Sequence, residues 1–293
     1  MRYLKDPRCL MVIAMSIFGT IPLFVRHLPL SSGEIALYRA MMAVALVGVY
    51  LAVTRQKLPW GEMKKKAIPL LISGAALGFN WILLFEAYRY TSVSTATLCY
   101  YFAPVLVTVV SLFLFKERLS WFQVLCFVMS TVGLVMITGF GGRGKSDFTG
   151  IALGLGAAVL YATVVLINKS MEGVTGIQRT FLQFSVAALV LIPYVACTGG
   201  VHLNTLTAPS WVMLLTVGFL HTGVTYCLYF SAVNRLSGQK VALISYLDPL
   251  IAVLISVLAL KETMTIFQMV GGVLIISFSL MNELVPLRKE HKK

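Results

Sequence analysis

Two stretches of the chain, GFNWILLFEAYRYTSVSTATLCYYFAPVLVTVVSLFLFKERLSWFQVLCFV at residues 78–128 and GVTYCLYFSAVNRLSGQKVALISYLDPLIAVLISVLALKETMTIFQMVGGV at residues 223–273, are two copies of one passage. At a constant offset of 145 residues and with no gap, 14 of their 51 positions are identical, Tyr101 and Tyr246 among them. Such a match indicates an internal duplication. In a hydrophobic chain, a duplication predicts two similar halves that can rock against each other around a site between them.

Composition places the duplicated chain in a membrane. Of its 293 residues, 58% are hydrophobic and only 12% are charged, and the mean hydropathy is +0.87. A water-soluble domain exposing that much apolar surface would aggregate. The net charge of +13 does not indicate nucleic-acid binding, because the basic residues lie between apolar runs and not on one continuous face. The five cysteines are scattered within apolar runs and form no C-x-x-C motif, so we interpret them as packing residues.

The apolar runs predict ten membrane-spanning helices, since only helices and closed barrels satisfy the backbone in lipid and no period-two pattern is present. We expect the spans at residues 9–26, 34–53, 67–87, 93–115, 122–140, 149–168, 178–198, 209–232, 239–260 and 266–284. The predicted fold is therefore an all-α integral membrane protein. Its first five-helix repeat covers residues 1–141, its second covers 148–287, and residues 288–293 form a basic cytoplasmic tail.

The basic residues predict how the spans are oriented. With the N-terminus in the cytoplasm, the inner connections and tails hold 18 Lys and Arg residues and the outer connections hold 5. The positive-inside rule therefore places both termini in the cytoplasm of a multi-pass cell-membrane protein. Because each half has five spans, the two repeats are inverted, with Lys116-Glu117 inside and its counterpart Lys261-Glu262 outside. Inverted repeats are typical of secondary transporters that work by alternating access.

The repeated passage resembles the drug/metabolite transporter superfamily, specifically its EamA-type members. The first copy carries the resemblance in EAYRYTSV from Glu86, in APV from Ala103 and in FKERLSWFQ ending at Gln123. The second copy carries it from Ala232 through Asp248-Pro249 to Gln268. The resemblance implies a carrier of small metabolites, often an exporter of amino acids or related compounds, with a central cavity between the halves. Typical members have apolar residues where this chain has Glu86 and Asp248.

Span nine and its counterpart hold the first candidate site residues. Pro104 and Pro249 occupy equivalent mid-span positions and predict paired helix kinks beside the substrate path, with Tyr101 and Tyr246 as twin aromatic walls; packing alone is the alternative. Asp248 replaces the alanine of the other copy. A carboxylate at that depth predicts a cavity residue that binds a substrate amine, a coupling proton or a cation of the protein, and a structural carboxyl is the alternative.

The charged residues near the span ends are expected to contact water or each other at the membrane surface. Arg39 follows Glu34 by five residues in span two, so we expect Arg39 to extend toward the membrane interface and Glu34 to be solvated. The alternative is that Arg39 receives a substrate carboxylate or pairs with Asp248 or Glu86. Glu86 precedes Arg89 by three residues, which predicts a surface ion pair at the cavity mouth.

Four further residues complete the candidate cavity. His221 lies mid-span and is the side-chain type most readily protonated near neutral pH, although a lone membrane histidine more often bonds a neighbouring helix. Asn80 and Trp81 occupy the positions that correspond to Thr225 and Tyr226. A small polar and a large aromatic group in each half suit a substrate cavity, and they suit helix contacts equally.

The favoured function is a secondary transporter moving a small metabolite, with the lipid bilayer and that substrate as its partners. An integral-membrane enzyme acting on a lipid or isoprenoid is the alternative, but the chain lacks hydrolase, zinc-protease and phosphate-loop motifs. A channel is a third option, for which no filter-like segment is present. No cofactor or metal is expected, because the four histidines are dispersed. A homodimer stays open, as does the choice between facilitated diffusion and proton coupling through Asp248 or Glu86.

Overall fold

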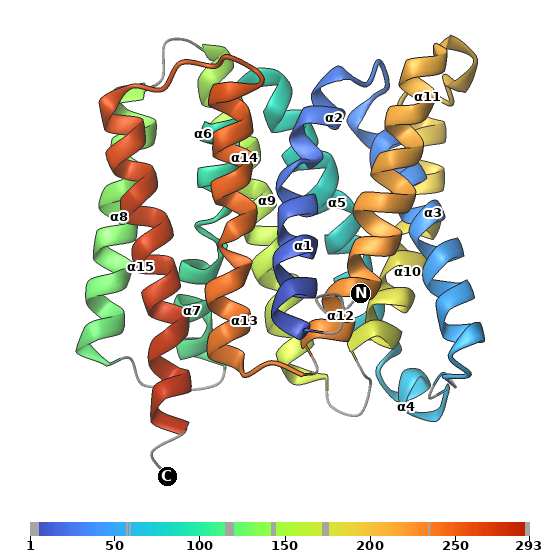
Figure 1. The fold of residues 1–293 in the computed structure, drawn as a ribbon, viewed down its shortest axis with the longest axis horizontal. Helices are drawn as coiled ribbons and strands as arrows, with labels where there is room; N and C mark the ends of the chain where they lie inside the picture. The colour runs from blue at the N-terminus through green and yellow to red at the C-terminus, as the bar shows by residue number, and fades with distance from the viewer. Residues whose placement is uncertain are drawn as a thin grey trace.

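The apolar runs form helices that lie side by side in a bundle (Figure 1). The computed structural model describes residues 6–56, 58, 60–114, 120–141, 145–171, 176–233 and 235–290. Its helices are α1 (Pro7–Gly19), α2 (Ile21–His27), α3 (Ser32–Val53), α4 (Trp60–Lys65), α5 (Ala67–Tyr90), α6 (Val93–Tyr100), α7 (Ala103–Leu114), α8 (Trp121–Gly141), α9 (Lys145–Ser170), α10 (Gly176–Thr198), η2 (Leu203–Thr205), α11 (Ala208–Leu215), η3 (Thr216–Val224), α12 (Thr225–Val233), α13 (Gly238–Ser245), α14 (Leu247–Leu258) and α15 (Ile266–Glu290).

Membrane length and apolar composition are confirmed for the predicted spans. Within the described residues, nine helical segments are long and apolar enough to cross a bilayer. The tenth predicted span corresponds to α15, which contributes a shorter apolar segment, Ile266–Asn282. The expected pair Lys116-Glu117, and parts of the linker and of the basic tail, lie outside the described residues.

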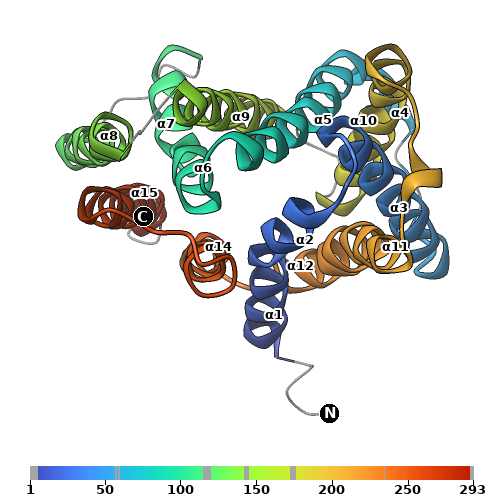
Figure 2. The same cartoon turned by 90° about the horizontal axis from the view of Figure 1, so that it is seen from above.

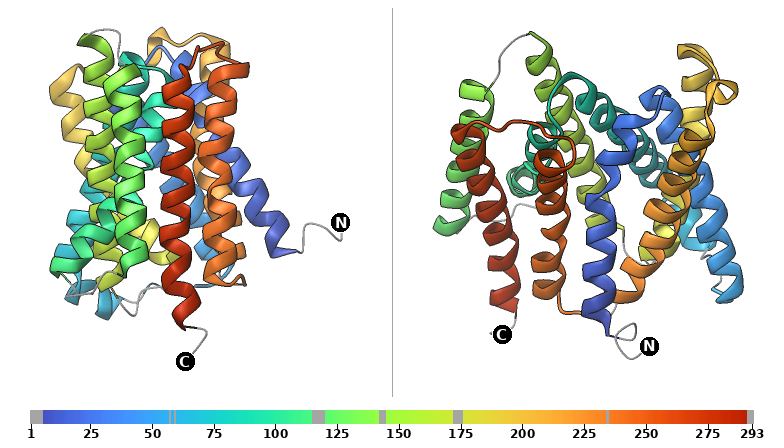
Figure 3. Two further views of the ribbon diagram at one scale, coloured as in Figure 1. Left: turned by 90° about the vertical axis from the view of Figure 1, so that its left-hand side faces the viewer. Right: turned by 45° about the horizontal axis from the view of Figure 1, so that its top comes forward.

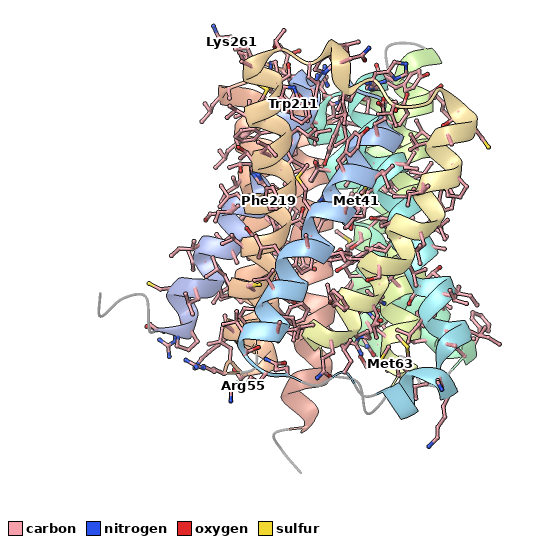
Figure 4. The ribbon with its side chains drawn as sticks, turned by 90° about the vertical axis from the view of Figure 1, so that its right-hand side faces the viewer. Met41, Arg55, Met63, Trp211, Phe219 and Lys261 are labelled. Atoms are coloured by element: carbon pink, nitrogen blue, oxygen red, sulfur yellow. The ribbon has the colours of Figure 1, made fainter. Side chains whose placement is uncertain are left out.

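The two halves run in opposite directions through the bundle. The start of α1 and the end of α15 lie at one end, here called the terminal end (Figure 3). Arg55 and Met63 also lie toward the terminal end, whereas Lys261 lies at the opposite or far end (Figure 4). The first span, α1 and α2, therefore runs from the terminal end to the far end, and α9, which opens the second half, runs back toward the terminal end (Figure 1).

Within the described part of the chain, the first, fourth and ninth spans are interrupted near their middle. The fourth span is divided into α6 and α7 at Tyr101 and Phe102, shortly before Pro104, and the ninth into α13 and α14 at Tyr246, three residues before Pro249. A proline cannot donate the helical hydrogen bond and crowds the carbonyl four residues earlier, which explains the equivalent breaks. The first span is divided between α1 and α2 at Thr20, with Pro22 in the next turn.

The duplicated sequence also produces duplicated helix caps. At the start of α8, the Gln123 amide oxygen accepts from the Ser120 backbone nitrogen at 2.9 Å, and the Gln123 nitrogen donates to the Ser120 hydroxyl at 3.3 Å. Thr265 and Gln268 make the same reciprocal pair at the start of α15, at 2.9 and 3.2 Å. Reciprocal caps of this kind satisfy donors that a helix start otherwise leaves unpaired. They explain why this glutamine recurs in both copies.

Helices α8 and α15 are the last spans of the two halves and pack side by side at one edge of the bundle (Figure 2). Two glycines permit their close approach. A Cβ atom on Gly133 would lie 2.6 Å from the Gly271 carbonyl oxygen, and one on Gly271 would lie 2.5 Å from the Gly133 carbonyl oxygen. Small residues at such crossings are the usual means of tight packing between membrane helices.

Candidate functional site

A cavity of about 1120 Å³ lies between the two halves of the bundle. Both halves supply its walls, from Phe18 and Trp81 in the first to Tyr226 and Asp248 in the second. The lining extends to the terminal end, where Lys169, in the last turn of α9, is exposed. Membrane proteins place irregular or polar elements at membrane depth only where they face protein or a wet cavity. The cavity therefore marks the place where the buried polar groups of this chain can act.

Asp248 lies in the first turn of α14, directly after the break in the ninth span, and lines the cavity. One of its carboxylate oxygens accepts a hydrogen bond from the Tyr101 hydroxyl at 2.5 Å. Tyr101 lies in the break of the fourth span, between α6 and α7, and its ring centroid lies 6.2 Å from that of Tyr246. The two broken spans thus bring the twin tyrosines and the single aspartate together. Gly19 allows this arrangement, because a Cβ there would lie 2.7 Å from the Asp248 carbonyl oxygen.

Arg39 lines the same cavity from α3 and is only 5% exposed. The centre of its guanidinium group lies 4.4 Å from the Trp81 ring centroid and 5.6 Å from that of Phe85. Its Nε donates to the Thr222 hydroxyl at 2.6 Å. The expectation that Arg39 extends to the membrane interface is wrong: aromatic faces and a buried hydroxyl hold this cation inside the bundle, where cation–π attraction is strongest.

Aromatic rings form much of the remaining wall. Trp81 and Tyr226, which occupy equivalent positions of the two copies, both line the cavity and both contact the buried ring of Phe184. Tyr100 stacks edge-on against Tyr101. Rings combined with a few placed polar groups are typical of sites that bind small molecules.

Two predicted cavity residues lie behind this wall. Asn80 donates to the Ala157 carbonyl oxygen at 2.6 Å and so links α5 to α9. His221 is buried between Thr20, whose hydroxyl lies 2.7 Å from its Nε2, and the Thr216 carbonyl oxygen, 3.0 Å from its Nδ1. Neither lines the cavity. Both positions belong to helix contacts, the alternative that sequence reasoning left open for them.

The two candidate glutamates lie toward the far end and do not line the cavity. Glu86 accepts from the Ser32 hydroxyl at 2.5 Å and lies 3.8 Å from Arg89. Glu34 is 1% exposed, so the expectation that it is solvated is wrong. Its carboxylate caps α3 by accepting from Ser31, and it also accepts from the His202 backbone nitrogen at 2.7 Å. These bonds to backbone donors replace the water that the sequence alone predicted.

Polar contacts between the halves close the far end. Glu262 lies 3.0 Å from Arg26 of the first half and accepts from the Val93 backbone nitrogen, also in the first half, at 2.8 Å. The Ser256 hydroxyl, from its own half, donates to it at 2.5 Å. Arg26 in turn donates to the Tyr88 carbonyl oxygen at 2.5 Å. The cavity is thus bounded by a network of ionic and backbone contacts at this end.

Sequence reasoning missed several lining residues. Tyr88, Tyr100 and Tyr161 line the cavity, as do polar residues near the terminal end, among them Arg179 and Gln183. Tyr88 and Tyr100 lie within the first copy of the duplicated passage, on the third and fourth spans, and could have been flagged by that position. The others lie on α9 and α10, outside the aligned copies, and nothing in their local pattern distinguishes a cavity face from a packed face.

Two inverted halves of membrane-spanning helices around a cavity lined by aromatic residues and a few charged and polar ones define the architecture of a membrane transport protein. The chain belongs to the EamA-like transporter family, which matches residues 8–139 and 148–282. An uncharacterized transporter of Bacillus subtilis, YxxF, is 30% identical over 270 residues, which are 90% of this chain and 85% of that protein. The threonine/homoserine exporter RhtA of Escherichia coli is 26% identical, covering 98% of this chain and 94% of its own.

A solved crystal structure supports the fold alone. It superimposes with a TM-score of 0.65 at 17% sequence identity and covers 95% of this chain and 98% of its own. Together with the family match, this confirms the ten-helix, two-repeat architecture expected from the duplication.

Proposed function

We propose that this chain is a secondary carrier that moves an amino acid or a closely related metabolite across the cell membrane, in the direction of export. The observation that carries the proposal is one cavity, shared by both halves, whose walls hold the buried cation Arg39 and the acid Asp248. An α-amino acid presents a carboxylate and an ammonium group, which match that pair of charges. The relative RhtA, a threonine/homoserine exporter, supports the same substrate class.

The size and surface of the cavity support a small solute. Binding sites for small molecules commonly measure about 300–1,000 Å³, and the cavity of about 1120 Å³ therefore has room for one amino acid with water around it. Rings such as Trp81 and Tyr226 offer apolar surface for a side chain. Lys169 and Arg179, nearer the terminal end, favour entry of solutes that carry a carboxylate.

The unequal ends of the cavity support alternating access. Its lining reaches the terminal end, whereas Arg26 and Glu262 join the halves across the far end. The excess of Lys and Arg in the connections at the terminal end supports a cytoplasmic location for that end and for both termini. On this basis the present conformation is open to the cytoplasm. Transport then requires the Arg26–Glu262 contacts to break while the terminal end closes.

Asp248 is the residue through which we propose that protons influence transport. Sequence reasoning left Glu86 as a second candidate, but Glu86 lies outside the cavity lining, with Ser32 and Arg89 as its partners. Asp248 faces the cavity, and its carboxylate can hold either a substrate amine or a proton. Competition of these two for one group would couple them.

Counterflow in proteoliposomes tests the proposal. The purified chain is reconstituted in vesicles loaded with an unlabelled amino acid, and uptake of the same labelled compound is measured across a panel of amino acids, nucleosides and cationic drugs. We expect saturable counterflow for at least one amino acid. Flux that does not saturate would indicate a channel, and inert vesicles together with turnover of a lipid substrate would indicate an enzyme. Either result would refute the carrier.

A further inference from the structure

The eighth span contains an unusual segment opposite Arg39. Between α11 and α12, residues Thr216–Val224 form the π-helix η3. Most π-helical segments are single-turn bulges, and they occur frequently at functional sites. Figure 4 places Phe219 of this segment and Met41 of α3 at similar heights, between Lys261 at the far end and Arg55 at the terminal end. The segment therefore lies at membrane depth beside the helix that carries Arg39.

The wider helix changes which carbonyl groups its threonines reach. In the α-helical spans, Thr108 and Thr131 donate to the carbonyl oxygen four residues earlier. In η3 and just after it, Thr222 donates to the Val217 carbonyl oxygen at 2.9 Å and Thr225 to that of Leu220 at 2.7 Å, each five residues earlier. The π-helical register thus orients the Thr222 hydroxyl differently from a threonine in an ordinary helix.

This orientation fixes the role of the Thr222 oxygen. A hydroxyl group has one proton, and that of Thr222 is directed to the Val217 carbonyl oxygen. Toward Arg39 the oxygen therefore accepts, and the Arg39 Nε donates to it at 2.6 Å. Thr222 is fully buried, so no water competes for this bond. The Trp81 ring covers the face of the same guanidinium group.

The remaining donors of Arg39 are all on its two terminal nitrogens. A guanidinium group can grip a carboxylate along the edge that includes Nε or along the end formed by Nη1 and Nη2. Thr222 occupies the Nε–H, so the first edge is blocked. Within the described residues, neither Nη atom has a hydrogen bond to the protein, and Arg39 lines the cavity. The Nη1 and Nη2 groups of Arg39 are therefore two adjacent N–H donors at the cavity wall.

We infer that Thr222 is a positioning residue that orients Arg39 to bind a carboxylate end-on through Nη1 and Nη2. The inference deepens the proposed function and rests on it for the role of the site in transport. It assigns the carboxyl end of the substrate to the wall formed by α3 and α5, behind which η3 holds Arg39. The amine of the substrate then faces the part of the cavity that holds Asp248 and Tyr101. A planar carboxylate fits two parallel N–H donors, whereas a lysine at position 39 would offer only a point charge.

Direct binding of simple anions tests the inference without requiring transport. Trp81 lies against Arg39, so its fluorescence reports a ligand at the guanidinium group. With Trp60, Trp121 and Trp211 replaced by Phe, Trp81 is the only tryptophan left in the chain. We expect acetate to change its emission saturably, and acetamide, at the same concentrations, to leave it unchanged. Inorganic phosphate serves as the comparison for a tetrahedral anion.

Variants separate positioning from packing. Thr222→Val keeps the shape but removes the accepting oxygen, and we expect acetate affinity to fall about tenfold, the effect of one hydrogen bond to a charged group. Thr222→Ser keeps the hydroxyl and is expected to bind acetate as the parent does. Arg39→Lys keeps the charge and is expected to lose the preference for acetate over phosphate. Arg39→Lys tests the carboxylate class alone, and Thr222→Ala, which also lacks the accepting oxygen, takes the place of Thr222→Val should that variant fail to fold.

Equal acetate affinity in Thr222→Val and the parent would overturn the positioning role. A parent that responds equally to acetamide, or that prefers phosphate, would overturn the carboxylate class. Failure of amino acid counterflow is a separate result: if acetate binding behaves as expected but no amino acid is exchanged, the proposed function is wrong and the oriented arginine stands.

Discussion

Neutralising Glu262 provides a direct test of the contacts that close the far end. Glu262→Gln keeps the size of the side chain but removes its charge. The contact with Ser256 lies within one half and persists in any conformation in which the halves move as units. The contacts with Arg26 and with the Val93 nitrogen join the two halves, so only these bias the equilibrium between conformations.

The size of the effect follows from those two contacts. A hydrogen bond to a charged acceptor is stronger than one to a neutral acceptor by about 1 kcal/mol. The ion pair contributes about 0.5 kcal/mol, discounted because the Arg26 side chain is 35% exposed. The sum of about 1.5 kcal/mol corresponds to roughly a tenfold shift toward the conformation open at the far end.

Cysteine accessibility measures this shift. The five native cysteines are replaced, Ile21 in the cavity lining is changed to Cys, and intact cells are treated with a membrane-impermeant maleimide. We expect Glu262→Gln to label about ten times faster than the parent, and Arg26→Gln to act in the same direction. Lys261→Gln changes the adjacent exposed charge and is the matched control, with labelling as slow as in the parent. If Glu262→Gln labels no faster than this control, the far-end contacts do not hold the carrier closed.

Three further perturbations have defined outcomes. Asp248→Asn should reduce amino acid counterflow about tenfold or more, since a bond to a charged group is lost, and should flatten its pH dependence; an unchanged rate and pH profile would remove Asp248 from the site. Gly133→Ala places a Cβ 2.6 Å from the Gly271 carbonyl oxygen, so we expect a loss of about 1–3 kcal/mol, seen as a lower Tm in detergent. Gly61→Ala, with nothing within 4 Å of its Cβ, is the control, and equal Tm values would contradict the tight crossing. Ser120→Ala should lower stability by about 1 kcal/mol through loss of the α8 cap, Ser120→Thr should not, and equal Tm values in both would show the cap to be dispensable.

The fold was predictable because its determinants are repeated or periodic. Apolar length sets the spans, and the odd number of spans in each half sets the inversion. The mid-span prolines marked two breaks because a missing backbone donor is written directly in the sequence. The break at Thr20 has its signal in Pro22, which our sequence reasoning passed over.

The site was only partly predictable, because orientation about a helix axis depends on neighbouring helices. Asp248 was predicted because a carboxylate within a membrane span is energetically costly and usually has a functional role. Arg39 carries the same cost, but the hydroxyl that holds it belongs to a π-helix 183 residues away. No local pattern in its sequence, TVGFLHTGV, predicts a π-helix instead of an α-helix. Asn80 and His221 show the converse case: polar side chains at membrane depth can bond neighbouring helices without lining the cavity.

The equivalent breaks before Pro104 and Pro249 have a mechanical consequence. Bending a continuous helix stretches or breaks its main-chain hydrogen bonds, whereas a helix already interrupted at one point can flex there with its other bonds intact. The fourth and ninth spans carry these interruptions next to each other in the cavity lining, where the ring centroids of Tyr101 and Tyr246 lie 6.2 Å apart. Each can therefore change its tilt without unwinding. The fourth and ninth spans can therefore bend at these two equivalent breaks, while the helical segments on either side of each break stay rigid.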